Sequence, residues 1–354
     1  MKRIVYIAVF ILLTAVTYAD GEIFKRWNSF EVEAKGVKKA EFSCKAMNWE
    51  KIEMKRTGKN SFGINLELPE GVWEYKYYFD GVENFDSKGD IIEEKDGIKK
   101  SYVKIYGKDL YGEKRDVVLQ GKVEKIEIES KILGEKTKVN IYFPPDYNKK
   151  KRYPVLYLLH GYDMNEEQWI DAGIANYMDN LIADKKIEPF IVVMPNGGTS
   201  FYTGKTEEYI TSELREYINK KYSVYKDREK TAVCGMSMGG YGAFRVAFNH
   251  QNLYGISVPL SAAFFDYHIK EIEESLNSGK QINFQMKIYC GLQDNIDLNG
   301  KTIIENNREA VKIFQKYGVK FDYEFDKGTH DYWYWGIKAE RYLQEISDFF
   351  IKKN

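Results

Sequence analysis

Residues 231–241 read Thr231-Ala232-Val233-Cys234-Gly235-Met236-Ser237-Met238-Gly239-Gly240-Tyr241, an apolar run that ends in a glycine-rich turn. The turn contains the pattern Gly-x-Ser-x-Gly, and a helical stretch follows it from Tyr241. A strand, a tight turn and a helix in this order form a nucleophile elbow, with the serine exposed at the corner. The glycines leave room for the turn, and the helix N-terminus directs amide N–H groups toward a developing oxyanion. We therefore predict Ser237 as a catalytic nucleophile at the edge of a sheet.

Strands and helices alternate on both sides of this segment, over residues 123–354. The early strands are joined by hairpins and the later ones by helices, which predicts an α/β domain with an eight-stranded, mostly parallel sheet. The strands are expected at 123–129, 138–143, 155–159, 190–194, 231–234, 256–260, 286–290 and 321–325. The helices are expected at 174–184, 207–221, 241–249, 306–317 and 339–352.

The region before this domain has a different pattern. Residues 22–106 contain short alternating strands separated by turn signals such as Thr57-Gly58-Lys59-Asn60 and Asp80-Gly81, without a long helical period. This pattern predicts a small β-sandwich. Residues 107–122, rich in Lys, Asp and Gly, are expected to form a linker between the two domains.

The first 19 residues have the pattern of a signal peptide. Lys2 and Arg3 precede an uncharged run over residues 4–16, and small residues stand at the −3 and −1 positions of a cleavage site after Ala19. An uncleaved anchor is the alternative, although the run is short for a span of about 20 residues. We expect an exported protein, secreted or periplasmic, with no membrane attachment after cleavage.

Composition excludes several classes of protein. The 354-residue chain has 53 Lys+Arg and 53 Asp+Glu, so its formal net charge is zero. Nucleic acid is therefore not expected as a partner, because phosphate binding needs a basic excess. Three cysteines are too few for a disulfide framework.

The four histidines narrow the choice of general base. In a domain with a nucleophile elbow the catalytic residues follow in the order serine, acid, histidine, so the base lies well after the serine. His330 follows the last predicted strand, where a loop can return the imidazole to Ser237. His250 and His268 lie earlier and are expected at the surface.

The acid is expected after the strand at 286–290. Asp294 stands four residues beyond the end of that strand, and Asp297 is the alternative. Either carboxylate could orient His330 and stabilise its charged form.

The oxyanion hole is expected from two backbone N–H groups. One belongs to Met238, directly after the nucleophile, and the other to Tyr162, in the loop after the third strand. His160, at the start of that loop, is interpreted as a structural residue. This chemistry needs no metal and no cofactor.

The N-terminal segment resembles a known family in two stretches, Met47-Asn48-Trp49 and residues 68–81. It is similar to the immunoglobulin-like carbohydrate-binding modules of family 48. The resemblance implies sugar-contacting roles for Trp49 and Lys76. Glu83 stands where a glucan-binding member usually has a second Trp, and a carboxylate cannot stack on a sugar ring. We expect a spacer or packing domain, with retained polysaccharide binding as the alternative.

The C-terminal domain resembles the esterase D-type α/β-hydrolases, in particular their feruloyl esterase branch. Besides the elbow, the matching stretches are 160–169, 173–181, 193–197, 222–225, 259–262, 290–294 and 330–335. The chain departs from the usual Gly-Gly-His before the base, having Gly328-Thr329. The resemblance implies a serine esterase that releases ferulate from feruloylated oligosaccharides or plant arabinoxylan through an acyl-enzyme. Acetylxylan and siderophore-lactone esterases belong to the same family and remain alternatives.

Aromatic residues near the strand ends are candidates for a substrate pocket, although each could equally pack in the core. They are Trp169, Tyr202, Phe264, Trp333 and Trp335. A different class of function stays open at this point, in which the chain binds polysaccharide without catalysis. The complete Ser, Asp and His set favours the enzyme.

Overall fold

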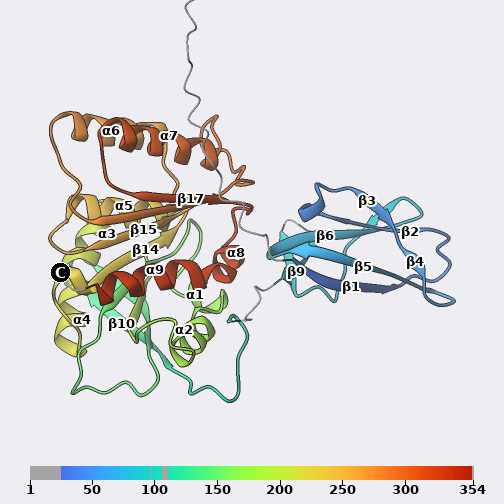
Figure 1. The fold of residues 1–354 in the computed structure, drawn as a ribbon, viewed down its shortest axis with the longest axis horizontal. Helices are drawn as coiled ribbons and strands as arrows, with labels where there is room; N and C mark the ends of the chain where they lie inside the picture. The colour runs from blue at the N-terminus through green and yellow to red at the C-terminus, as the bar shows by residue number, and fades with distance from the viewer. Residues whose placement is uncertain (1–24, 96, 106–110, 353–354) are drawn as a thin grey trace, which may run out of the picture.

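The computed structural model describes residues 25–95, 97–105 and 111–352 (Figure 1). The predicted signal peptide over residues 1–19 and its cleavage site lie outside these residues. The described chain forms a β-sandwich followed by an α/β domain, and the two meet at helix α8 (Figure 1).

The sandwich has two antiparallel sheets, ordered β1-β5-β4 and β3-β2-β6-β9-β8, with β7 paired to β6. In β6, Trp73, Tyr75 and Tyr77 point into the core, while Glu74 and Lys76 lie on the outer face, as the two-residue period of a strand requires. The elements are β1 Lys25–Glu33, β2 Ala40–Cys44, η1 Lys45–Met47, β3 Lys51–Glu53, β4 Lys55–Arg56, β5 Ser61–Pro69, β6 Gly71–Phe79, β7 Val82–Asn84, β8 Ile91–Lys95 and β9 Ile98–Ile105.

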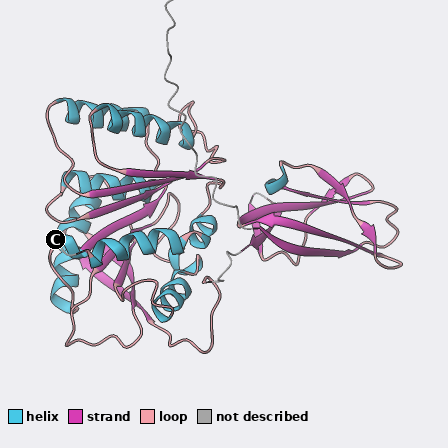
Figure 2. Ribbon diagram, viewed as in Figure 1, coloured by secondary structure: helices cyan, strands magenta, loops and turns pink. Residues whose placement is uncertain are grey.

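The second domain has an eight-stranded sheet in the order β10-β11-β13-β12-β14-β15-β16-β17, covered by helices on both faces (Figure 2). The pairs β10·β11 and β11·β13 are antiparallel, and the remaining pairs are parallel. The strands are β10 Lys122–Ser130, β11 Glu135–Phe143, β12 Val155–Leu159, β13 Ile191–Pro195, β14 Thr231–Met236, β15 Ile256–Leu260, β16 Gln285–Gly291 and β17 Asp322–Asp326. The predicted fold class, an α/β-hydrolase sheet preceded by a small β-sandwich, is confirmed.

The helices of this domain are α1 Gln168–Asp171, α2 Ile174–Ala183, α3 Lys205–Glu208, the π-helix η2 Tyr209–Leu214, α4 Arg215–Lys221, the short η3 Arg228–Lys230, α5 Met238–Asn249, α6 Asp266–Asn277, α7 Ile303–Lys316, α8 Tyr332–Ile337 and α9 Ala339–Ile351. The sequence did not predict α1, α6 or α8. Helix α6 is mostly polar and buries only a narrow stripe that includes Ile269, Ile272 and Leu276. Helix α8 has six residues and is rich in aromatic side chains, which are only moderate helix formers.

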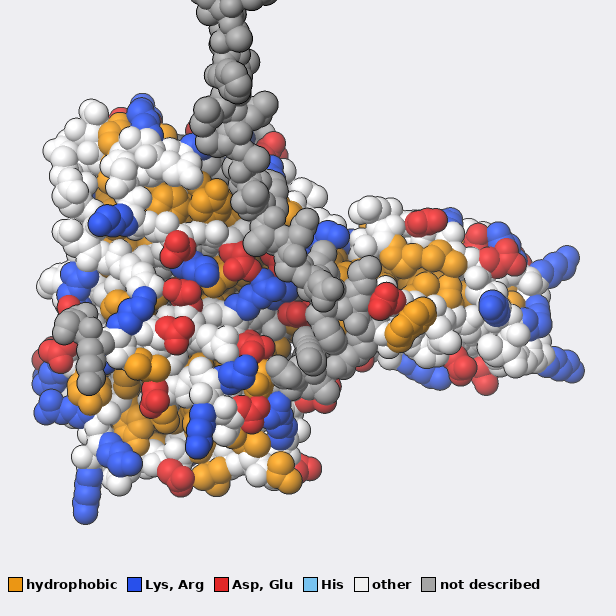
Figure 3. Space-filling view, in the orientation of Figure 1, with side chains coloured by type: hydrophobic (Ala, Val, Ile, Leu, Met, Phe, Trp, Pro, Cys, Tyr) orange, Lys and Arg blue, Asp and Glu red, His pale blue; other side chains and the backbone are white. Residues whose placement is uncertain are grey.

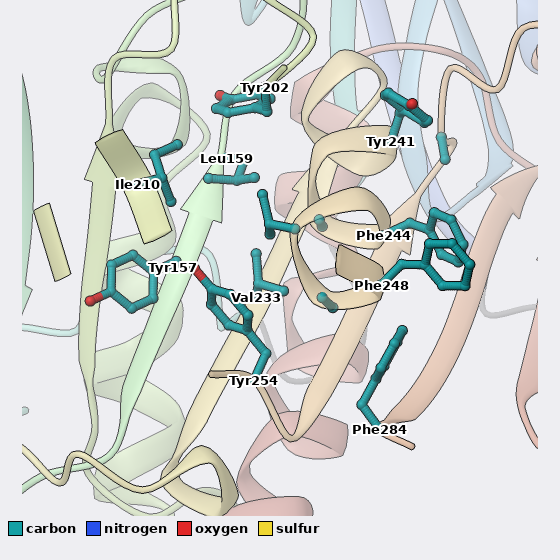
Figure 4. Close-up of a cluster of buried hydrophobic side chains, with 14 of the residues drawn as sticks. Tyr157, Leu159, Tyr202, Ile210, Val233, Tyr241, Phe244, Phe248, Tyr254 and Phe284 are labelled. Carbon is teal, nitrogen blue, oxygen red and sulfur yellow. The ribbon is translucent and has the colours of Figure 1, made fainter. Parts of the chain in front are cut away.

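Two hydrophobic clusters fill the faces of the sheet. In β12, Tyr157 and Leu159 point into the cluster beneath α5, while Leu156 and Leu158 point into the cluster beneath α2 and α9. Figure 4 shows part of the first cluster, with Phe244 and Phe248 of α5 side by side. A strand buried on both faces is apolar throughout, as β12 is.

Residues 111–121, predicted as the end of a linker, pack against α2. The Asn180 amide donates to the Tyr111 carbonyl over 2.8 Å, and the Gly121 N–H donates to Asp179 over 2.8 Å. Arg115 forms an ion pair with Asp184 at 2.9 Å. This stretch therefore belongs structurally to the α/β domain.

Charges of both signs are interspersed over the face of the α/β domain in Figure 3, in keeping with the zero net charge. None of the described helices combines the length and the apolar character that crossing a bilayer requires.

Candidate active site

Ser237 lies at the corner between β14 and α5. Its backbone has φ +57°, an unfavourable conformation for a residue with a side chain. A Cβ atom at Gly235 would come within 2.8 Å of the Leu159 carbonyl oxygen, and one at Gly239 would overlap the same oxygen. The turn can therefore form only with glycine at both positions, as the elbow motif predicts.

Three side chains from three loops form a continuous hydrogen-bond chain. His330 Nε2 lies 2.8 Å from Ser237 Oγ, and His330 Nδ1 lies 2.8 Å from Asp294 Oδ2. The loops follow β14, β16 and β17, whose carboxyl ends meet at one edge of the sheet. The arrangement can remove a proton from the serine and hold the resulting imidazolium.

Asp294 is fully buried, and its Oδ1 atom has no hydrogen-bond partner among the described residues. The contact with His330 Nδ1 orients the imidazole, and the buried carboxylate can stabilise the imidazolium that forms when the serine proton is transferred. The alternative acid, Asp297, is exposed and accepts a hydrogen bond from the Gly300 N–H over 3.1 Å within its own turn. The structure brings Asp294 to the histidine and leaves Asp297 at the surface.

The loop that carries His330 is held by residues that the sequence did not single out. Asp331 caps α8 by accepting a hydrogen bond from the Tyr334 N–H over 2.6 Å. Thr329, which departs from the expected glycine, donates its hydroxyl proton to Asp331. A side chain at Gly328 would overlap the Tyr334 ring, so this glycine is required.

Of the two predicted oxyanion donors, Met238 follows Ser237 directly, and Tyr162 follows Gly161, where an added Cβ atom would lie 3.7 Å from the Ser237 Cβ atom. Met238 is the first residue of α5, so its N–H has no acceptor within the helix. The neighbour of Tyr162, Gly161, donates its N–H to Gln168 over 2.8 Å, which fixes the loop. Together, the N–H groups of Met238 and Tyr162 can stabilise a developing negative charge next to Ser237.

His160 supports the loop before Tyr162. It is buried, and burial lowers its pKa, so the ring is neutral at physiological pH. Its Nε2 atom accepts a hydrogen bond from the Gly197 N–H over 2.8 Å, which leaves Nδ1 to donate to the Gly161 carbonyl. This contact agrees with the structural role expected for His160.

Each of the two domains matches a known protein family. Residues 130–341 match the family described as "Putative esterase". Residues 34–111 match the family described as "Glycogen recognition site of AMP-activated protein kinase". The chain belongs to this esterase family. It is a carboxylic ester hydrolase with an N-terminal module of the immunoglobulin-like carbohydrate-binding type, and the alternative of a non-catalytic protein is set aside.

Three relatives illustrate the match. An endo-1,4-beta-xylanase/feruloyl esterase of Xylanibacter ruminicola is 30% identical over 254 residues, which are 67% of this chain and 33% of that enzyme. An acetyl esterase of Caldicellulosiruptor saccharolyticus is 27% identical over 276 residues, covering 64% of this chain and 99% of that protein. A solved ferulic acid esterase, 26% identical, covers 66% of this chain and 99% of its own, with a TM-score of 0.56. The esterase thus spans only a third of the bifunctional relative.

Most of the aromatic residues predicted to bind substrate lie in the core of the esterase, which corrects that prediction. Trp169 is 1% exposed and donates its indole N–H to the Leu159 carbonyl over 3.0 Å. Tyr202 is fully buried within the cluster of Figure 4, and its hydroxyl accepts a hydrogen bond from the His160 N–H over 3.0 Å. Phe264 and Trp335 are buried as well, whereas Trp333 is half-buried. All five residues were expected near Ser237 because they follow strand ends. Four of them, Trp169, Tyr202, Phe264 and Trp335, instead lie in the core.

The accessible aromatic side chains of this region are different ones. The ring of Tyr162, 52% exposed, lies 5.9 Å from Phe201, which lies 5.5 Å from Phe265. Phe265 stacks on the exposed Tyr267 at 5.5 Å. We name these four residues the aromatic strip. They come from three separate loops and the start of α6, so no local sequence signal could have joined them.

His268, expected at the surface, is instead buried. It stacks on Tyr241 with ring centroids 3.7 Å apart, and burial lowers its pKa to about 4. His250 is half-buried, with Nε2 3.1 Å from Glu207. Among the described residues, no group of three or more His, Cys, Asp or Glu is arranged to hold a metal ion.

The two residues expected to contact sugars, Trp49 and Lys76, contact each other. Trp49 is 38% exposed, and the Lys76 ammonium lies 5.1 Å from the centre of its ring. The same ammonium forms an ion pair with Glu83 at 2.8 Å. Lys76 is therefore engaged by the carboxylate that replaces the second stacking ring.

We expect the esterase to show no measurable retention on glycogen or granular starch in a pull-down with the full chain. One half-exposed ring gives little stacking area, and the Lys76–Glu83 pair must be broken before Lys76 can bind a sugar hydroxyl. Retention of the unmodified chain on either polymer, lost on Trp49→Ala, would overturn this expectation.

Proposed function

We propose that this esterase hydrolyses ester-linked hydroxycinnamates, such as ferulate, on plant cell-wall arabinoxylan or its fragments, with Ser237, His330 and Asp294 as catalytic residues. The observation that carries the choice of acyl group is the accessible aromatic strip, which begins at Tyr162, the expected oxyanion donor. Two of the similar proteins are named as a feruloyl esterase and a ferulic acid esterase, which supports the same acyl group.

The reaction proceeds in two steps. Ser237 Oγ attacks the ester carbonyl as His330 Nε2 accepts its proton, and the N–H groups of Met238 and Tyr162 stabilise the oxyanion. His330 then returns the proton to the oxygen of the leaving alcohol, and the carbon–oxygen bond breaks. Water, deprotonated by the same imidazole, attacks the acyl-enzyme and releases the acid. Asp294 holds Nδ1–H and stabilises the imidazolium in both steps.

The aromatic strip favours a flat aryl acyl group over acetyl. A hydroxycinnamoyl group buries far more apolar surface than a methyl group, and about 25 cal/mol per Å² converts that difference into a few kcal/mol. Ring-on-ring contact with Phe201 or Tyr162 adds to this preference. A preference realised in the transition state raises kcat/KM.

The predicted export of the esterase and its neutral charge favour a polymer-derived substrate. The predicted signal peptide would place the esterase outside the cytosol, where formylglutathione is absent. The neutral chain offers no long-range attraction to an anionic catecholate siderophore. An acetylated polysaccharide is the second candidate, because the acetyl esterase relative matches over nearly its whole length.

The test is a comparison of kcat/KM for methyl ferulate with that for a short-chain acetate ester. We expect methyl ferulate to be preferred by about tenfold or more. Phe201→Ala should reduce this preference by removing the centre of the strip. The matched control is Phe85→Ala, since Phe85 is an exposed phenylalanine of the sandwich.

Acetylated xylan and a trilactone siderophore are assayed alongside methyl ferulate and the acetate ester. Faster cleavage of either than of every hydroxycinnamate ester would overturn the feruloyl assignment. The assignment as a serine esterase would survive that result.

A further inference from the structure

A cleft of about 500 Å³ opens at the end of the sandwich that lies farthest from the α/β domain. Strand β4, which supplies two of its lining residues, lies at this end (Figure 1). The volume falls within the range of about 300–1,000 Å³ that is typical of small-ligand sites. We name this the basic cleft, and its lining residues are Lys38, Lys39, Glu53, Met54, Lys55, Arg56 and Phe62.

The basic cleft is separate from the positions expected to contact sugars. Lys39 lies directly before β2, at one end of that strand. Trp49 lies at the other end, where its backbone N–H donates to the carbonyl of Cys44 over 3.1 Å. Neither Trp49 nor Lys76 lines the cleft, so any ligand of the cleft has its own set of contacts.

Backbone carbonyls hold the guanidinium of Arg56 in place. It donates to the carbonyls of Val37 and Lys59, each over 2.9 Å. The guanidinium also lies over the ring of Phe62, 4.5 Å from its centre, which is a favourable place for a cation. Carbonyl oxygens and a ring orient this side chain but carry no full negative charge. Arg56 is therefore a fixed cation without a carboxylate counter-ion.

The basic cleft holds more positive charge than its one carboxylate can balance. Lys39 forms an ion pair with Glu41 at 2.8 Å and lies 3.8 Å from Glu53, the carboxylate of the cleft. The other three cations of the cleft have no ion-pair partner among the described residues. Lys and Arg side chains project from this end of the sandwich in Figure 3. In a chain of zero net charge, this local excess attracts anions.

The lining of the basic cleft offers charge but almost no apolar surface. Met54 and Phe62 are 3% and 2% exposed. The lining therefore presents no ring that could stack on a neutral sugar or a nucleobase, and no apolar side chain that could enter a bilayer. Ammonium and guanidinium groups donate hydrogen bonds and accept none, and their strong partners are carboxylates and phosphates.

We propose that the basic cleft binds carboxylate groups of an acidic polysaccharide, such as the glucuronic acid side groups of a xylan. The choice of a polysaccharide over other polyanions rests on the proposed function, which places the esterase on plant cell-wall polymers. Attachment at this cleft, far from Ser237, keeps the polymer close and raises the effective concentration of its esters at the active site. Small esters without a carboxylate gain nothing from it.

The experiment measures Kd of the full chain for glucuronoxylan and for the same polymer after its carboxyl groups have been reduced to alcohols. We expect glucuronoxylan to bind about tenfold more tightly at low salt, and the difference to shrink at high salt because exposed charges are screened. Lys38→Gln/Lys55→Gln should weaken binding of glucuronoxylan by about three- to tenfold, since each exposed ion pair contributes modestly. The same variant should leave kcat/KM for methyl ferulate unchanged.

Lys149→Gln/Lys150→Gln is the matched control, because it removes the same charge from an exposed basic run of the α/β domain. It should leave Kd for glucuronoxylan unchanged. Equal affinity for the native and the reduced polymer, or an equal loss of affinity in both double variants, would overturn the proposal. Tighter binding of a DNA oligonucleotide or of phosphatidylglycerol vesicles than of glucuronoxylan would overturn it as well, in favour of a phosphate ligand.

The binding measurement involves no ester hydrolysis. Failure of the proposed function therefore appears in the comparison of methyl ferulate with the acetate ester, whereas failure of the basic cleft appears in the Kd values. The two results are independent of each other.

Discussion

Ser237→Ala and His330→Ala should each lower kcat for ester hydrolysis by about 10³-fold or more, because nucleophile and base act as one unit. The serine Oγ and the imidazole Nε2 are already 2.8 Å apart, so removal of either leaves the other without its partner. The measurement is steady-state hydrolysis of a chromogenic ester, with thermal unfolding to verify that each variant is folded.

The double variant Ser237→Ala/His330→Ala should be no slower than either single variant, since residues of one catalytic unit are not additive. His250→Ala is the matched control, because His250 pairs with Glu207, and it should retain most activity. Near-normal turnover in Ser237→Ala would contradict the assignment of the nucleophile.

Asp294→Asn should lower kcat by about 10²-fold or more, although less than the loss of the serine or the histidine. The Asp294 carboxylate accepts a hydrogen bond from the Nδ1–H group of His330 over 2.8 Å and stabilises the imidazolium. An asparagine amide is neutral, and it can present N–H to Nδ1 and so favour the wrong tautomer. The measurement is kcat at a pH where the unmodified esterase is fully active.

Asp297→Asn provides the matched control for the acid. Its carboxylate is exposed and caps a local turn at Gly300, so activity should change by less than about twofold. A crippled Asp297→Asn beside a mildly affected Asp294→Asn would reverse the assignment.

The parts of this molecule predictable from sequence are those set by short-range patterns. The elbow around Ser237 follows from glycines that nothing larger can replace. Strand β12 has the predicted bounds because it is a continuous apolar run, and β15 because its five buried residues are apolar except for Ser257. The order of serine, acid and histidine, together with its place after the last predicted strand, led to the prediction of His330 as the base, and the structure brings its imidazole to Ser237.

The parts that escaped prediction depend on contacts between distant segments. Trp169 and Tyr202 are near the strand ends in sequence, but hydrogen bonds to Leu159 and His160 turn them into the core. His268 is buried because it stacks on Tyr241 of another helix. Likewise, nothing near Tyr102 in the sequence indicates its contact with Trp333, more than two hundred residues away.

The most direct test of the central claim is covalent labelling of the esterase with a fluorophosphonate, followed by mass mapping of the modified peptide. An activated serine esterase reacts at its nucleophile, because the adjacent base raises the reactivity of that hydroxyl alone. The account predicts one modification, at Ser237, that is absent in Ser237→Ala and strongly slowed in His330→Ala. Labelling at another residue, or labelling of Ser237→Ala at the rate of the unmodified chain, would contradict it.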